Sequence, residues 1–66
     1  MRATIEPFEH WCRDHCGEVL EDRGSVQKVR RWFLKKADGT TSGGLFASPA
    51  EAVEFASEND LHIVDG

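Results

Sequence analysis

A cluster of histidine and cysteine side chains near the N-terminus has the greatest potential for chemistry in this sequence. The cluster contains His10, Cys12, His15 and Cys16, and one further histidine, His62, lies far along the chain. The candidate metal ligands are Cys12, His15, Cys16 and His62, because His10 points the other way on the helix expected here. Apolar residues recur at steps of three and four over about 7–21, which predicts an amphipathic helix. Zinc prefers thiolate and imidazole ligands in a tetrahedral set. On such a helix Cys12, His15 and Cys16 share one face, and His62 could complete a zinc site.

The competing interpretation is that the two cysteines are small core residues. Structural zinc sites typically pair two short ligand clusters, whereas this sequence has one cluster and one distant histidine. Cysteine is among the most frequently buried residue types. Two cysteines four residues apart in a helix also have a poor geometry for a disulfide. We therefore expect no bound metal, and reduced thiols at Cys12 and Cys16.

The sequence offers little support for catalysis. The cysteines lie beside Asp14 and Glu18 in the middle of the expected helix, whereas reactive thiolates are stabilised by helix N-termini or cationic neighbours. The serines lack a nucleophile-elbow pattern, and the glycines do not follow the spacing of a phosphate-binding loop. A chain of 66 residues can spare little core for a deep cavity. We expect no enzymatic activity and no cofactor.

Two further segments predict a β-hairpin. Residues 26–36 and 41–47 are rich in β-branched and aromatic side chains. Asp38-Gly39 lies between them and is typical of a type I′ turn, which needs positive φ at both central positions. The provisional cross-strand pairs are Trp32 with Leu45 and Phe33 with Gly44.

The C-terminal third predicts a second helix and a closing strand. Ser48-Pro49-Ala50-Glu51 is a capping box with proline at the first helical position, so we expect a helix over about 49–58. Residues 61–64 follow as a strand. The expected fold is a single α+β domain of residues 1–66 in the order α-β-β-α-β. It would have two layers, with a mainly antiparallel sheet and the helices on one face.

Charge is sorted into blocks along the chain. Residues 23–36 contain six lysines and arginines and no acid, whereas residues 1–22 and 37–66 are predominantly acidic, and the formal net charge is −4. Such a basic segment is either neutralised by its flanks or presents a positive stripe to a partner. The candidate basic contact residues are Arg30, Arg31, Trp32 and Lys35. The candidate acidic contact residues, on the second helix, are Glu51, Glu54 and Glu58.

These surfaces favour a protein-interaction module, acting as an adaptor or an inhibitor. Tryptophan and arginine are enriched at binding hot spots. In size, acidity and mixed α/β character the chain is similar to compact phage or bacterial accessory proteins, including inhibitors that occupy a larger protein's surface. The expected partner is another protein or a second copy of this chain in a homodimer.

Single-stranded nucleic acid is an alternative partner for the basic strand 26–36. Arg31, Phe33 and Lys35 share one side of such a strand, and an open sheet face there could stack a base and neutralise phosphates. The acidic pI of about 5.2 argues against it, because nucleic-acid modules are usually basic. A small metal-binding protein using the cluster described above is the third interpretation.

The sequence predicts a cytoplasmic protein without membrane contact. No apolar run approaches the roughly 20 residues that span a bilayer. The first residues after Met1 lack the apolar core of a signal peptide. Reduced thiols are consistent with the cytosol.

Overall fold

The computed structural model describes residues 1–14 and 17–64. Of the described residues, 55% lie in strands and 16% in a single helix. The elements in chain order are β1 (Arg2–Cys12), β2 (Glu18–Asp22), β3 (Gln27–Lys36), β4 (Thr41–Phe46), α1 (Pro49–Glu58) and β5 (His62–Ile63).

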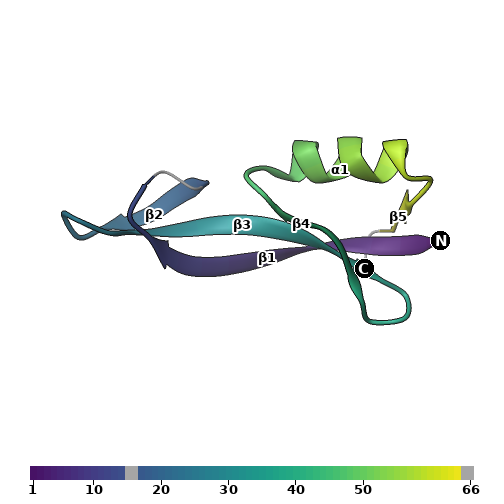
Figure 1. Ribbon diagram of the computed structural model, residues 1–66, viewed down its shortest axis with the longest axis horizontal. Coiled ribbons are helices and arrows are strands. Elements are labelled where there is room, and N and C mark those ends of the chain that lie inside the picture. The colour runs from purple at the N-terminus through teal and green to yellow at the C-terminus, as the bar shows by residue number, and fades with distance from the viewer. Residues whose placement is uncertain (15–16, 65–66) are drawn as a thin grey trace.

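β3 is the central strand of a mixed sheet (Figure 1). β1 pairs antiparallel with one edge of β3, from Ala3 opposite Lys36 to Cys12 opposite Gln27. β2 and β4 both pair with the other edge of β3, at opposite ends of the strand. β5 adds in parallel beside the start of β1. The long ribbon of β1 and β3 gives the molecule its elongated shape, 41 × 20 × 17 Å.

The helix predicted over residues 7–21 is wrong. β1 and β2 occupy this stretch, and apolar side chains such as Trp11 and Leu20 are exposed instead of facing a core. Pairing with β3 outweighs the helical periodicity, because each residue of β1 gains a partner along the ribbon. One of these pairs is an ion pair, in which Arg30 Nη2 lies 3.6 Å from Glu9 Oε1.

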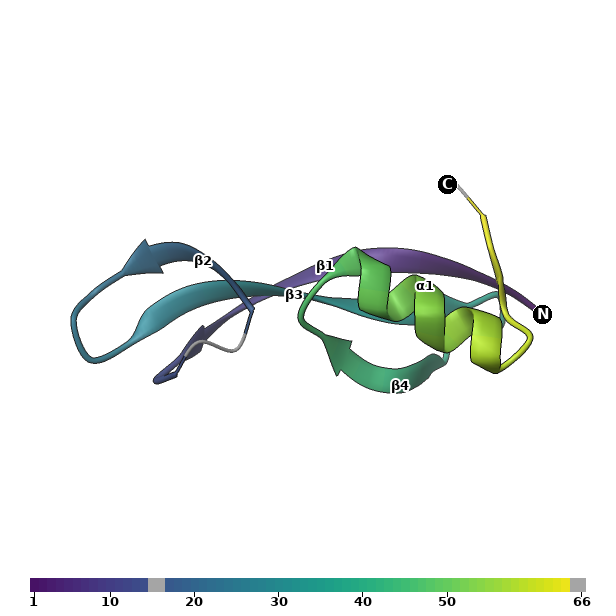
Figure 2. The same ribbon diagram turned by 90° about the horizontal axis from the view of Figure 1, so that it is seen from above.

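The expected two-layer α+β architecture is therefore also wrong. The protein is mostly β, with a curled mixed sheet that is not mainly covered by helices. Figure 2 shows α1 lying over the half of the sheet that contains β4, while β2 lies beyond it. Leu34, Ala52 and Ala56 are fully buried between α1 and β3. The partly buried residues around them are Ile5, Phe46, Phe55, Leu61 and Ile63.

The helix predicted at 49–58 is present, and its cap explains where it begins. The Glu51 N–H donates to Ser48 Oγ at 3.3 Å, and the Glu51 carboxylate accepts from the Ala47 N–H at 2.9 Å. The serine half of the capping box is thus formed, while the Glu51 carboxylate reaches one residue further back than the N-cap, to Ala47. Among the described residues, no helix is long and apolar enough to cross a membrane.

The β3–β4 turn is not the predicted type I′ turn. Gly39 has a φ of +90°, but Asp38 does not have a positive φ. The Gly39 N–H donates to the Lys36 carbonyl at 2.9 Å, and the Lys36 N–H donates to the Thr40 carbonyl at 2.8 Å. This is the three-residue loop in which a type I turn is followed by a left-handed glycine.

Asp38 stabilises this turn through its carboxylate. Hydrogen bonds from the Thr40 hydroxyl, and then from the Thr40 N–H, lower the pKa of Asp38 below its ordinary value of 3.8. A lowered pKa in the folded chain means that the contact stabilises the turn above pH 3.8. This contribution is lost as the pH falls through the lowered pKa.

The cross-strand pairs predicted for the hairpin are also wrong. Trp32 pairs with Phe46 and Leu34 pairs with Ser42, with an irregularity between them. Gly43 and Gly44, which lie in this interval, both have a φ of +78°. The two glycines therefore form a bulge that shifts the register of β4.

Beyond Ala3, none of the described residues pairs with the outer edge of β1, and Pro7 lies on this edge. The Ala37 N–H donates to the Arg2 carbonyl at 3.1 Å, so the even-numbered residues of β1 direct their backbone groups toward β3. The odd-numbered residues point outward, as shown by the Val64 N–H donating to the Ala3 carbonyl at 3.0 Å. The missing N–H of Pro7 therefore costs no hydrogen bond to β3, because this residue directs its backbone groups away from β3. Its ring also hinders the addition of another strand at this edge.

Candidate functional site

α1 covers one face of the sheet at the end that contains β4, and leaves the opposite face of this end open. At the β2 end the opposite face is not open, because Val29 there is fully buried. Leu34 and Ile5 are paired and lie on the α1 side. Side chains alternate along a strand, so Phe33 and Lys35 point to the opposite face, where none of the described helical residues lies (Figure 1). We call this surface the open face. Its residues are Arg2, Thr4, Glu6, Phe8, Arg31, Phe33, Lys35, Thr41 and Leu45.

Cations outnumber carboxylates on the open face. Among the open-face residues named above, three are cations, Arg2, Arg31 and Lys35, and one, Glu6, is a carboxylate. The Glu6 carboxylate accepts a hydrogen bond from the Thr4 hydroxyl at 3.1 Å. Within residues 1–14 and 17–64, no salt bridge joins these three cations to a carboxylate. A chain with a net charge of −4 therefore has a face that favours anions.

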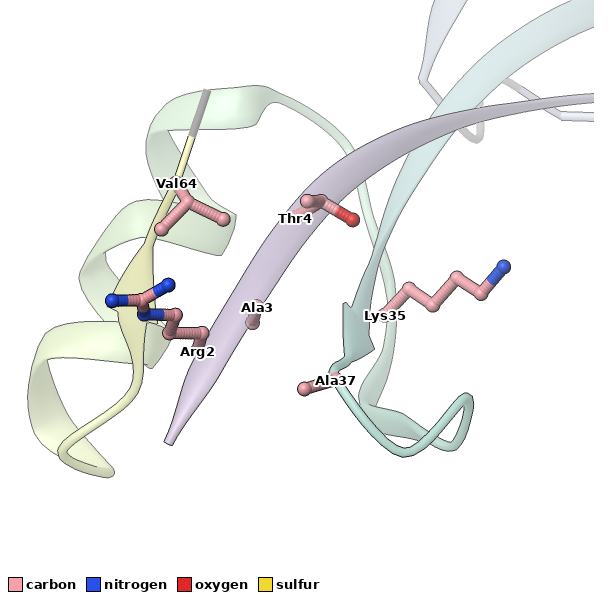
Figure 3. A pocket seen from close by; sticks show the side chains of 6 residues that line it. All are labelled: Arg2, Ala3, Thr4, Lys35, Ala37 and Val64. Atoms are coloured by element: carbon pink, nitrogen blue, oxygen red, sulfur yellow. The ribbon is translucent and has the colours of Figure 1, made fainter. Parts of the chain in front are cut away.

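A shallow hollow lies on each side of Lys35 on the open face. The hollow toward β4 has a volume of about 310 Å³ and is lined by Phe33, Thr41, Gly44 and Leu45. The hollow toward β1 and β5 has a volume of about 190 Å³ and is shown in Figure 3. Its lining residues are Arg2, Ala3, Thr4, Lys35, Ala37 and Val64. The Arg2 guanidinium lies beside Val64, while the Lys35 ammonium extends away from the hollow (Figure 3).

The structure divides the predicted basic stripe between two faces. Arg31 and Lys35 lie on the open face, whereas Arg30 and Trp32 alternate onto the α1 side. Arg30 is the partner of Glu9 described above, and Trp32 is half-buried. These four residues therefore do not form one continuous surface.

The predicted acidic contact residues lie in the other layer of the molecule. Glu51, Glu54 and Glu58 are all exposed on α1. The Glu51 carboxylate is already engaged in the helix cap through the Ala47 N–H. The sheet therefore separates these carboxylates from the cations of the open face.

The predicted metal ligands do not come together among the described residues. His62 pairs with Arg2 at one end of β1, and Cys12 is the last residue at the other end. At about 3.3 Å per residue, roughly 30 Å separates them, so they cannot share a metal ion. No group of three potential ligands occurs in residues 1–14 and 17–64. His15 and Cys16 lie outside the described residues.

Cys12 is disulfide-bonded, contrary to the expectation of a reduced thiol. The objection to a disulfide assumed a regular helix, whereas Cys12 is the last residue of a strand. Because Cys12 does not lie in a helix, the geometric argument against a disulfide does not apply.

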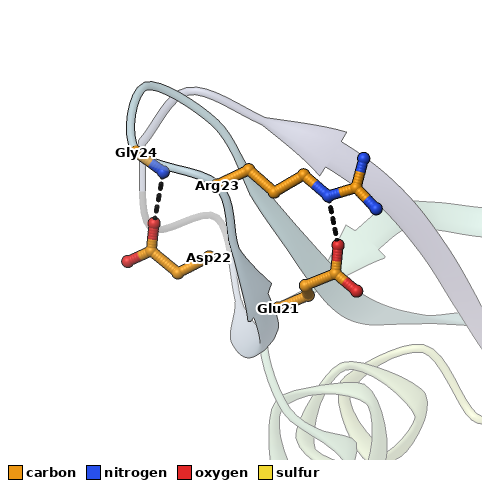
Figure 4. Close-up of polar contacts among 4 residues, drawn as sticks. All are labelled: Glu21, Asp22, Arg23 and Gly24. Carbon is orange, nitrogen blue, oxygen red and sulfur yellow. Dashed lines mark hydrogen bonds and ion pairs between the residues drawn. The ribbon is translucent and has the colours of Figure 1, made fainter.

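The end of the sheet around β2 carries exposed apolar side chains but balanced charges. Trp11, at 45% exposure, stacks against the Arg23 guanidinium, which lies 5.0 Å from its ring centroid. Figure 4 shows that Arg23 Nε also donates to the Glu21 carboxylate at 2.6 Å, and that the Gly24 N–H donates to the Asp22 carboxylate at 2.9 Å. The charges here are paired locally, in contrast to those of the open face.

Arg2 and Leu45 were missed as site residues in the sequence. Alternation along a strand already groups Arg31, Phe33 and Lys35, and this signal was available. The position of Arg2 depends on its pairing with Ala37, far along the chain, and that of Leu45 depends on the bulge in β4. Neither leaves a local sequence pattern.

No protein-family model, curated protein or solved structure matches this chain.

Proposed function

We propose that this chain is a small protein-interaction module that binds an acidic partner protein through the open face. This proposal depends on one observation. The face that α1 leaves uncovered has an excess of cations around apolar side chains. Phe33 and Leu45 supply an apolar centre. Arg31 and Lys35 flank Phe33 on the same face of β3. This is the usual anatomy of a protein interface, in which arginine is enriched.

Single-stranded nucleic acid is the second candidate, and a specific observation favours it. Phe8 and Phe33 lie on the open face together with Arg31 and Lys35, and such a surface can stack bases and neutralise phosphates. The net charge of −4 would repel a polyanion at longer range. A protein segment with a few carboxylates meets less of this repulsion, so we favour a protein partner.

The lining of the two hollows favours binding over catalysis. Neither hollow is lined by a carboxylate, a histidine or a cysteine. These are the side chains that most often perform acid–base and nucleophilic chemistry. The proposal is therefore a binding protein, without enzymatic activity.

The cytoplasmic location stays a prediction, and one observation argues against it. Disulfides are rare in cytosolic proteins and common in oxidising compartments. The disulfide at Cys12 is therefore more typical of a protein that works outside the reducing cytosol.

Substitution of Phe33 tests the proposal. Partner proteins are captured from a native lysate with the wild-type chain, and the best-enriched partner is purified and titrated by calorimetry. Phe33→Ala should weaken this binding about 30-fold, the effect of a hot spot of about 2 kcal/mol. Val53→Ala is the matched control, because Val53 is 48% exposed on α1, in the other layer.

The two variants give clear alternatives. Loss of binding with Val53→Ala and full binding with Phe33→Ala would place the interface on α1 and overturn the proposal. Tight, steeply salt-dependent binding of random single-stranded oligonucleotides that requires Phe33 would favour the nucleic-acid function instead.

A further inference from the structure

We infer that the partner segment carries two apolar anchors, which occupy the hollows on either side of Lys35, and carboxylates that meet the surrounding cations. This inference rests on the proposed function and specifies the chemistry of the partner. It follows from the size of the hollows, their spacing and the charges around them.

The hollows are suited to single side chains. Their volumes of about 310 and 190 Å³ lie at or below the lower end of small-molecule pockets, which span roughly 300–1,000 Å³. Phe33 and Leu45 make the walls of the larger hollow apolar, and Ala37 and Val64 do so for the smaller. Aliphatic side chains would bury this surface most favourably.

The spacing of the hollows fits two neighbouring anchors on one segment. The larger hollow lies toward β4 and the smaller toward β1, on opposite sides of β3. Strands lie about 4.8 Å apart, so about 5–10 Å separates the two hollows. An extended segment places side chains i and i+2 on one side about 7 Å apart, which is within this range.

The cations require carboxylates in the partner. Lys35 lies between the hollows, and Arg2 lines the smaller one. Neither forms a salt bridge with a carboxylate among the described residues. A purely apolar partner would desolvate these charges without pairing them, which is costly, whereas an acidic partner pairs them.

A second copy of the chain fits the open face less well. The acidic surface of α1 offers Glu51, Glu54 and Glu58, but Val53 is its one large, strongly exposed apolar side chain. Such a surface could fill one hollow and leave the other empty. Because α1 and the open face lie on opposite sides of the sheet, this contact would also build an open chain of subunits instead of a closed dimer.

Three synthetic peptides test the inference. Each is titrated into the isotope-labelled full chain, and NMR monitors the binding. The probe peptide is acetylated and amidated and has the central sequence Leu-Glu-Leu-Glu between glycines. One control peptide has lysine in place of glutamate, and the other has glycine in place of leucine. We expect the probe to shift the signals of Phe33, Thr41, Leu45 and Val64 and to bind at least tenfold more tightly than either control.

Two charge reversals on β3 complete the experiment. Lys35→Glu should weaken the probe at least tenfold. Lys28→Glu should leave its affinity unchanged, because Lys28 lies on the same strand but pairs with Trp11 on the other face.

The remaining outcomes overturn the inference. Equal binding of the probe and either control would contradict it, as would equal effects of the two charge reversals. Absence of probe binding at 1 mM, with a native partner that still requires Phe33, would refute the anchors and leave the proposed function intact. Self-association of the chain that is lost in Glu54→Lys would identify a second copy as the occupant.

Discussion

Leu34→Ala is expected to unfold the half of the molecule that carries α1. Leu34 is fully buried and packs against Ala52 and Ala56 of the helix. Removing a buried leucine side chain typically costs about 2–5 kcal/mol, because apolar burial is lost and a cavity remains. A domain of this size has only a few kcal/mol of stability to lose.

Urea denaturation followed by tryptophan fluorescence measures this loss. The control is Leu45→Ala, which removes the same atoms from a residue that is 37% exposed on the open face. We expect the control to cost less, about 1–2 kcal/mol, since the Leu45 side chain is only partly buried and its removal leaves no closed cavity. Equal losses from the two variants would show that Leu34 is not the centre of the core.

Gly43→Ala is expected to be the next most damaging single change. A Cβ atom at Gly43 would lie 2.8 Å from ring atoms of Phe46 and Phe55, which belong to the packing beneath α1. The rings pack against each other with centroids 5.4 Å apart, so they have little room to move. The φ of +78° adds a backbone penalty of about 1–2 kcal/mol for any side chain with a Cβ.

Gly44→Ala is the matched control for this variant. Gly44 has the same φ of +78°, but a Cβ there meets no atom within 4 Å. The difference between the two variants in the free energy of unfolding therefore isolates the clash with the phenylalanine rings. We expect Gly43→Ala to be the less stable by about 1–3 kcal/mol. Equal stabilities would contradict the packing of Phe46 and Phe55 around this glycine.

Local sequence signals predicted the second half of the fold and failed in the first. The capping box at Ser48 and the turn at Gly39 are encoded by a few adjacent residues, and the structure contains a helix and a turn there. The stretch 7–21 has helical periodicity, but its structure depends on pairing with β3, which is distant in sequence. The local sequence does not show whether this stretch is more stable as a helix or as strands paired with β3.

The open face was only partly accessible from the sequence for the same reason. Arg31, Phe33 and Lys35 alternate along one strand, which requires only that the segment be a strand. Grouping Arg30 and Trp32 with them ignored this alternation, and the structure places both on the α1 side. The two hollows need residues from β1, β4 and β5 and could not be predicted without the sheet order.

The central claim is that an uncovered sheet face with a positive charge lies opposite α1. Paramagnetic relaxation of side-chain protons by a neutral and by an anionic gadolinium chelate tests it directly in solution. We predict that the anionic chelate relaxes the protons of Phe33, Thr41 and Leu45 more strongly than the neutral one, and those of Val53 more weakly. Protection of Phe33 from both chelates, or equal relaxation by the two, would contradict the claim.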